Sequence, residues 1–589
     1  MRMRKAHYAA VVAVGALSLS ACSGGGGGGG GQLADTAKPK VQKVTLGTAA
    51  DSQGPAADVP GAKKGGTVYD LEQTDFNHLD PGHLYVSNQQ AISTLYARTL
   101  TGYKIDPKTG DMKLVGDLAT DTGQMSDGGK TWTYHLKDGL KYEDGSPVTA
   151  QDIKYGIERT YAPWETEGAS YVQIWMSGTS YQKTYSGPFD GKDLPDSLVA
   201  TPDSKTIVFH FKDPHADAPY AMAMPDVSPI PKAKDTQQKY DLHPVSTGPY
   251  KIEDYKPGKS LTLVRNTNWD PKTDPIRQQY PDKWSISVNI PNPGLTQRLM
   301  AGSGNDKYAT SLSQSADPSQ MTTILGDSKY KSRIINQYQP FVDMLNINTK
   351  RVKDVRVRKA IMYAFPMAAA QQATGGSAQG DMATSLMSPT ITGSRDFDPF
   401  DKLKKPAGDP EKAKELLKEA GVTTPLKLTI AYANTPKWSN FANTLKNAFS
   451  KAGIDLQLQP IDATAAYTLI GKVNNEYDMY RTGWAADWPN GSTAIQPIMD
   501  GRLIGDGQEN YSFLNDPKVN SEIDRINAIP DLKSQQAEWQ KLSDTIMQND
   551  VPAVPFAYDK FFQLYGSGLG GVTFNQEIGV INANTIFVK

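Results

Sequence analysis

The sequence predicts an α/β protein with mixed sheets and more than one domain. With 589 residues, the chain is long enough for two or three domains of about 100–200 residues each. Hydrophobic residues make up 38% of the chain and charged residues 21%, which is typical of globular domains with a buried core. A strand, a helix and a second strand follow one another between residues 427 and 458, the order expected of an α/β unit.

The first residues predict export. Arg2, Arg4 and Lys5 precede an apolar run over residues 9–21, which is too short to span a bilayer and fits the apolar region of a signal peptide. The run ends in Leu-Ser-Ala before Cys22, a pattern that resembles the lipobox of bacterial lipoproteins. We therefore expect residues 1–21 to be a lipoprotein signal peptide and Cys22 to be the lipidation site. The alternative is an ordinary secretory signal followed by a chance cysteine.

A flexible tether is expected after the signal. Eight glycines occupy residues 24–31, and residues 22–64 are rich in Gly, Ala, Lys, Asp and Pro without sustained periodicity. This composition predicts a lipid-anchored flexible linker over residues 22–64. The expected location is the extracytoplasmic face of the cell membrane, because the signal would export the chain and a lipid on Cys22 would hold it there. No later segment approaches the length of a membrane span.

Composition also argues against several classes of function. The formal net charge is −1, which does not suit a nucleic-acid-binding protein with its basic face. The chain has a single cysteine, so neither a disulfide nor a cysteine-based metal site is expected. The seven histidines show no metal-binding spacing such as H-E-x-x-H. We therefore expect no metal, no cofactor and no nucleic-acid partner.

The first half of the chain predicts several strands and one well-marked helix. Residues 132–136 alternate like a half-buried strand, and residues 206–211 and 260–264 are further strands. Thr149 with Asp152 three residues later forms a variant of the capping box, which predicts the start of a helix at residue 150.

The second half predicts the α/β unit. Apolar residues recur at helical spacing from 354 to 365, and Pro366 closes that helix. A second helix is expected from Asp409 to Lys418, with Pro410 at its first position. We expect strands at residues 427–432, 454–458 and 477–484, and a helix at residues 440–451.

Four motifs, in order along the chain, carry a family resemblance. The first is TYHLKDGLKYEDGSPVTAQD over residues 133–152, and the second is STGPYK from residue 246 followed by LVRN from 263. The third is LNINT from residue 345 with VRVRKA from 355, and the fourth runs from YD at 477 to GWAADW at 483–488. Over residues 65–589 their order and spacing resemble the extracytoplasmic solute-binding proteins of peptide-type ABC importers, the oligopeptide- and dipeptide-binding group.

The resemblance implies a fold and a division into domains. The fold would be bilobal and periplasmic-binding-protein-like, in the large variant with three subdomains and hinge crossovers. Lobe 1 would combine residues 65–104, 198–291 and 556–589 as its main domain with residues 105–197 as an accessory domain. Lobe 2 would be residues 292–555.

The resemblance also implies a function. The protein would be a receptor and not an enzyme, and it would capture oligopeptides or dipeptides by hinge closure. It would then deliver them to an ABC permease, whose ATPases drive transport. We expect a monomer.

The fourth motif supplies the main candidate for ligand binding, Asp487. It follows a predicted strand of an α/β lobe, where clefts open. A carboxylate there can pair with the free amino group of a peptide, the role that the resemblance implies. The alternative is a turn cap, because Asp487 precedes Trp-Pro-Asn-Gly. Trp484 would form an apolar wall, with core packing as the alternative, and Ala485 would offer main-chain groups to an extended peptide.

Further candidates come from the resemblance alone. Arg481 would stabilise Asp487 or bind a ligand carboxylate, with a surface arginine as the alternative. His83 and Tyr85 follow the Leu-Asp-Pro segment at 79–81, which would lie along the ligand. Tyr558 would lie at the last crossover between the lobes. The remaining candidates, at the end of a strand, are Tyr432 and Asn434.

Three other functions fit parts of the sequence. A secreted hydrolase is one, although the chain has no G-x-S-x-G elbow and no zincin motif. The same fold binding an oligosaccharide, a nickel complex or a siderophore is another, and the 28 tyrosines and nine tryptophans would suit sugar stacking. The third is a receptor for a peptide signal.

Overall fold

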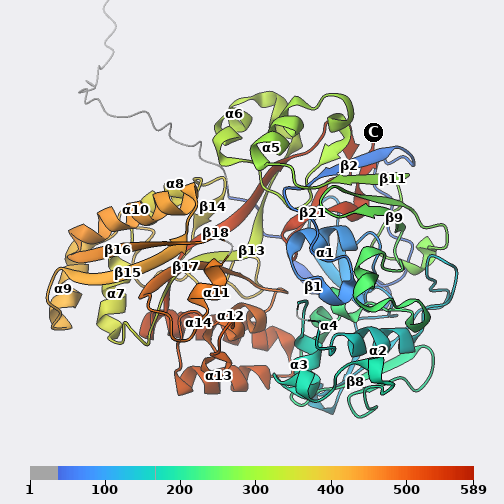
Figure 1. The fold of residues 1–589 in the computed structure, drawn as a ribbon, viewed down its shortest axis with the longest axis horizontal. Helices are drawn as coiled ribbons and strands as arrows, with labels where there is room; N and C mark the ends of the chain where they lie inside the picture. The colour runs from blue at the N-terminus through green and yellow to red at the C-terminus, as the bar shows by residue number, and fades with distance from the viewer. Residues whose placement is uncertain (1–37, 166, 464) are drawn as a thin grey trace, which may run out of the picture. The chain divides into compact units, whose positions relative to one another are not determined.

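The computed structural model describes residues 38–165, 167–463 and 465–589 (Figure 1). Cys22 and the expected signal peptide lie outside the described residues, so both remain predictions. Within the described ranges, no helix combines the length and the apolar character needed to cross a membrane.

A six-stranded mixed sheet forms the centre of the second lobe, in the order β14-β18-β13-β17-β15-β16. The pairs β14–β18, β18–β13 and β13–β17 are antiparallel, whereas β15 is parallel to both β17 and β16. The strands are β13 (Ile334–Ile347), β14 (Gly380–Met382), β15 (Leu426–Ala433), β16 (Ile454–Ile461), β17 (Met479–Ala485) and β18 (Ala553–Leu564).

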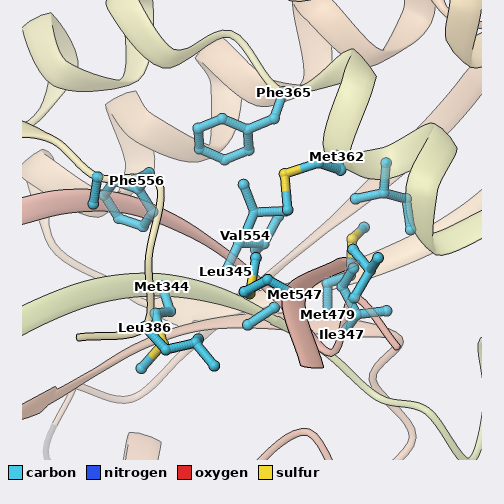
Figure 2. Packing of buried hydrophobic residues seen from close by; sticks show 14 of the residues in the cluster. Met344, Leu345, Ile347, Met362, Phe365, Leu386, Met479, Met547, Val554 and Phe556 are labelled. Carbon is cyan, nitrogen blue, oxygen red and sulfur yellow. The ribbon is translucent and has the colours of Figure 1, made fainter. Parts of the chain in front are cut away.

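The helices of this lobe follow or separate these strands along the chain. They are α7 (Val355–Ala364), α8 (Met367–Ala373), α9 (Pro410–Glu419), α10 (Pro436–Lys451), α11 (Ala466–Ile470), α12 (Gly491–Met499), α13 (Pro517–Asn527) and α14 (Leu532–Asn549). Figure 2 shows part of the core that they enclose, where Phe365 after α7 lies near Phe556 of β18, and Met344 and Leu345 come from β13.

The main domain of the first lobe is built on a five-stranded mixed sheet in the order β12-β2-β11-β10-β9. Its strands are β2 (Thr67–Leu71), β9 (Tyr250–Lys256), β10 (Ser260–Arg265), β11 (Lys283–Ser287) and β12 (Ala309–Thr310). Smaller sheets accompany it, namely β1 (Val44–Leu46) with β4 (Met112–Gly116) and β3 (Thr101–Ile105), β19 (Leu569–Gly570) with β22 (Phe587–Val588), and β20 (Thr573–Asn575) with β21 (Val580–Asn582). Its helices are α1 (Ser87–Ser93), α5 (Asn292–Ala301) and α6 (Met321–Gly326).

An antiparallel four-stranded sheet, β5-β6-β8-β7, organises the accessory domain. The strands are β5 (Gln124–Ser126), β6 (Thr131–His135), β7 (Val199–Ala200) and β8 (Thr206–His210), and the helices are α2 (Ala150–Arg159), α3 (Tyr171–Ser177) and α4 (Ala218–Ala221). Trp132, Tyr134 and Phe209 from β6 and β8 are buried in its separate hydrophobic core.

Strands β13 and β18 run through two hydrophobic cores. Ile335 and Phe561 pack in the core of the five-stranded sheet, whereas Leu345 and Val554 lie in the core of the six-stranded sheet. The pairing of the two strands shifts register near Pro340, which has no N–H to donate. Strands β13 and β18 thus agree with the expected hinge crossovers. The irregular part of their pairing lies between the two cores.

Most predicted elements are confirmed, and their starts depend on capping. Thr149 and Asp152 form the capping box of α2, each side chain accepting from the other residue's backbone N–H. Helix α10 begins at Pro436, four residues before the expected start, because the Thr435 side chain caps it and Pro436 occupies its first position. The prediction of an α/β chain with mixed sheets is also confirmed.

The expectation of a flexible linker does not hold for residues 38–64. Strand β1 lies in this segment and pairs in parallel with β4, far outside it in the sequence. The Gln42 backbone N–H donates to the Gln576 side chain (2.9 Å), and the Gln42 amide donates to the Phe574 carbonyl (3.1 Å). Val59 is buried against Tyr280. These partners lie far away in the sequence, so composition alone could not reveal them.

The sheets also shift two of the expected domain boundaries. Strands β7 and β8 pair within the accessory sheet, so that domain continues beyond residue 197. Strand β12 pairs with β2, so the segment after residue 292 first contributes to lobe 1. The rest of the expected division remains a prediction.

Candidate functional site

A cavity of about 750 Å³ is lined by segments from both lobes. This volume lies within the usual range of small-ligand sites, roughly 300–1,000 Å³. The first lobe contributes Tyr85, Val86, Ser87, Gln90, Glu577 and Ile578. The second lobe contributes Pro340, Phe341, Tyr467, Thr468, Lys472, Gly483, Trp484, Ala485, Ala486, Asp487, Asp506, Gly507, Glu509 and Tyr511.

Asp487 lies two residues beyond the end of β17, and two tyrosines contact its carboxylate. The Tyr85 hydroxyl donates to Oδ2 at 3.1 Å, and the Tyr171 hydroxyl donates to the same oxygen. Tyr85 precedes α1 and Tyr171 begins α3, so both donors belong to the first lobe. The carboxylate is therefore held at the junction of the two lobes.

The surroundings of Asp487 alter its acidity. Burial raises the pKa of this carboxyl to about 6, the Tyr171 and Tyr85 hydrogen bonds lower it, and the nearby Glu509 carboxylate raises it. Desolvation and the nearby Asp487 carboxylate raise the pKa of both tyrosines well above its usual value, so they remain protonated donors. At neutral pH, Asp487 is mainly ionised and can accept a hydrogen bond from a cation.

Trp484 and Ala485 also line this cavity, on the last residues of β17. The indole N–H of Trp484 donates to the Thr493 carbonyl at 2.6 Å, which fixes the ring against α12. Ala485 pairs in register with Phe341 of β13. These two candidates therefore lie next to Asp487 in the cavity wall.

Arg481 does not contact Asp487 within the described structure. Its guanidinium pairs with the Asp343 carboxylate and lies 3.8 Å from the centre of the Trp438 ring. Arg481 and Tyr432 instead line a neighbouring cavity of about 270 Å³. Asn434 is exposed and lines neither cavity.

Tyr558 and His83 also lie outside the main cavity. The Tyr558 hydroxyl is buried and accepts from the backbone N–H of Ser385 at 3.0 Å. His83 is buried and contacts His78 and Glu165. The segment that carries His83 does reach the cavity, but it does so through Tyr85.

Tyr171, Glu509 and Glu577 are among the residues of the site that the sequence analysis missed. Tyr171 belongs to a segment rich in Tyr, Gly and Ser, and no motif marks it. Glu509 and Glu577 lie outside the four motifs but line the cavity. Burial raises the pKa of Glu577 to about 8. Only the fold brings these side chains together, so spacing could not have identified them.

Aromatic rings, carboxylates and small residues line this cavity, a mixture that suits a small-solute site. Two lobes joined by crossing strands, with a cavity lined from both, define a periplasmic-binding-protein-like receptor.

Comparisons with known proteins identify the family. The model of the bacterial extracellular solute-binding proteins, family 5 (middle), matches residues 113–505, so the chain belongs to this family. The resemblance carried by the four motifs is thus confirmed, as is the expectation that the protein is a solute-binding protein and not an enzyme.

Several curated proteins align with most of the chain. The glutathione-binding protein GsiB of Salmonella typhi is 23% identical over 507 residues, covering 85% of this chain and 90% of GsiB. The probable D,D-dipeptide-binding periplasmic protein DdpA of Escherichia coli K12 is 24% identical over 533 residues, covering 86% and 92%.

Solved structures agree on the fold. The clavulanic acid biosynthesis oligopeptide binding protein 2 superposes with a TM-score of 0.83 and 27% identity, covering 92% of this chain and 100% of that one. DppA of Helicobacter pylori in complex with the peptide STSA gives a TM-score of 0.68 at 19% identity, covering 89% and 98%, and supports the fold alone.

Proposed function

We propose that the protein captures peptides with a free amino terminus, and that the Asp487 carboxylate pairs with the peptide ammonium. The position of Asp487 in the cavity wall carries this proposal. A charge-assisted hydrogen bond to a partly buried carboxylate is stronger than one between neutral groups. Relatives named for binding glutathione, D,D-dipeptides and oligopeptides support a peptide as the solute.

The charges around the cavity favour a cationic group. Asp487, Asp506 and Glu509 line it together with Glu577, whose pKa of about 8 leaves it mainly protonated at neutral pH, whereas Lys472 is the single basic residue of the lining. Such an excess of carboxylates attracts an ammonium group and disfavours a free ligand carboxylate. A peptide would present its amino end to Asp487, and its carboxyl end would point away from these acidic side chains.

Capture would be followed by closure and delivery. Ligand contacts with both lobes would favour the closed form, since a ligand shifts an equilibrium only through its differential affinity. We further propose that Cys22 carries a lipid that holds the receptor at the extracytoplasmic face of the membrane. There it would pass the peptide to an ABC permease and its ATPases.

The first experiment compares free and blocked amino termini. Native mass spectrometry of the purified protein identifies a co-purified peptide, and a random pentapeptide mixture serves as the probe if none is found. Isothermal titration with the same peptide, free or N-acetylated, should show at least about tenfold weaker binding of the acetylated form, because the charge is lost. Equal affinity for both forms would contradict the proposal.

An oligosaccharide is the second candidate solute. Trp484, Phe341, Tyr467 and Tyr511 give the same cavity an aromatic lining that could stack on sugar rings. Titration with defined oligosaccharides separates the two functions. Saturable sugar binding without peptide binding would favour this alternative.

A further inference from the structure

Two histidines and an aspartate converge in the first lobe, away from the lining of the main cavity. His78 and His83 flank the Leu-Asp-Pro segment, and Asp241 lies in the 3₁₀ helix η7 (Gln237–Leu242). One ligand-type atom from each of the three lies within 4.8 Å of the others. We propose that His78, His83 and Asp241 form a zinc-binding site.

The donor atoms face one another closely. Nδ1 of His78 lies 2.5 Å from Oδ2 of Asp241 and 3.1 Å from Nδ1 of His83. The two imidazole rings are nearly perpendicular, with centroids 4.5 Å apart. Two imidazole nitrogens and one carboxylate oxygen are a donor set that Zn²⁺ accepts, with its fourth position open to water.

The surrounding groups match the supports of a metal site. Ligating histidines usually offer their second ring nitrogen to a carboxylate, which fixes the ring and strengthens the ligand. Nε2 of His83 contacts the Glu165 carboxylate, and Nε2 of His78 lies 3.5 Å from Oε2 of Glu167. Both histidines therefore turn Nδ1 toward the centre of the cluster and Nε2 toward an acid.

Backbone N–H groups fix the orientation of the Asp241 carboxylate. Its Oδ1 accepts from the backbone N–H groups of Leu79 and Asp80, both at 2.8 Å, so Oδ2 is left for the cluster. The Asp80 carboxylate cannot serve as a ligand, because it is paired with Arg159 at 2.7 Å and caps η1 (Pro81–His83). The groups left at the centre are therefore His78, His83 and Asp241, and Glu165 lies behind the His83 ring at its Nε2.

A buried acid beside the cluster supports a cation at its centre. Glu165 is 2% exposed, and Nε2 of the buried His83 contacts its Oε2. Its Oε1 accepts no hydrogen bond from a described residue. The carboxylates of Glu165 and Asp241 thus face two imidazoles, and burying negative charge is costly unless it is paired. A divalent cation on Nδ1 of His83 would strengthen the contact of its Nε2 with Glu165.

The site would stiffen the edge of the ligand cavity. His83 is two residues before Tyr85, which lines the cavity and donates to Asp487. Zinc would tie this turn to η7 and, through Glu165, to the segment before α3. The sequence analysis expected no metal, because His83 and Asp241 lie 158 positions apart and no short motif joins them.

The test uses the purified mature protein after treatment with EDTA. Native mass spectrometry should show one bound zinc on addition of ZnCl₂, and isothermal titration should give a one-to-one complex. His78→Gln and His83→Gln should each weaken zinc binding at least about tenfold. His210→Gln is the matched control, since His210 contacts Thr131 on the accessory sheet and not this cluster.

Thermal unfolding provides the second readout. Zinc should raise the Tm of the wild type and of His210→Gln but not that of the two cluster variants, whose metal-free Tm shows that they fold. Cobalt substitution should add a visible absorption band that the cluster variants lack. No stoichiometric zinc on the wild type, or equal affinity in the wild type and both cluster variants, would overturn the proposal.

Discussion

At the residue scale, the proposed recognition of an ammonium group depends on the surroundings of Asp487. It is half-buried in a cavity wall, two neutral hydroxyls hold one of its oxygens, and its pKa is raised by burial. The motif around residues 483–488 was sufficient to predict this position. It could not supply Tyr171, because that contact joins residues 316 positions apart.

The pH dependence of binding follows from the acidity of Asp487. The raised pKa of about 6 means that the free protein takes up a proton below that pH, and this proton must leave before an ammonium can pair. The affinity for a free-amino peptide should be nearly constant from pH 7.5 to 6.5. It should fall by up to about tenfold per pH unit below 6.

Isothermal titration in overlapping buffers measures this dependence. N-acetylated peptides are the control and should show no such fall. A free-amino peptide whose affinity stays constant down to pH 4.5 would argue against an ionised Asp487 as the partner.

At the scale of elements, local capping decides where the helices begin. The capping box at Thr149 and the apolar repeat at 355–364 could be recognised in the sequence, because each is a pattern among neighbouring residues. The start of α10 was missed although its cap is also local, because Thr435 and Pro436 precede any visible apolar repeat. Strand β1 was missed for a different reason, since it has only three residues and its partner β4 lies far away in the sequence.

The cap of α2 can be tested directly. The Thr149 side chain accepts from the Asp152 backbone N–H, so Thr149→Ala should lower the free energy of unfolding by about 1 kcal/mol. Thr236→Ala is the matched control, because Thr236 precedes η7 without a side-chain cap bond. Denaturant unfolding followed by circular dichroism measures both. Equal losses would show that the cap contributes little.

At the scale of the whole molecule, the contacts between the lobes cluster beside the cavity. Asp217 of the accessory domain accepts from the Trp488 indole at 3.0 Å, from the Asn490 amide at 3.1 Å and from the Ser492 hydroxyl at 2.5 Å. These three donors follow Asp487 directly along the chain. The family resemblance predicted two lobes with crossovers, but it gave no sign of this shared acceptor.

Closure should therefore depend on ligand and on Asp217. Small-angle scattering of the wild type should show a smaller radius of gyration when a bound peptide is present than after its removal. Asp217→Ala removes the shared acceptor and should shift the ligand-free protein toward the open form. A radius of gyration that is the same with and without peptide would contradict closure by hinge motion.

The most direct test of the central claim is the affinity of Asp487→Asn for a free-amino peptide. The amide keeps the size of the side chain but loses its charge, so isothermal titration at pH 7.5 should show binding weaker by about 2–5 kcal/mol than in the wild type. The same variant should bind the N-acetylated peptide as the wild type does. Unchanged affinity for the free-amino peptide would show that the Asp487 carboxylate does not pair with the ammonium.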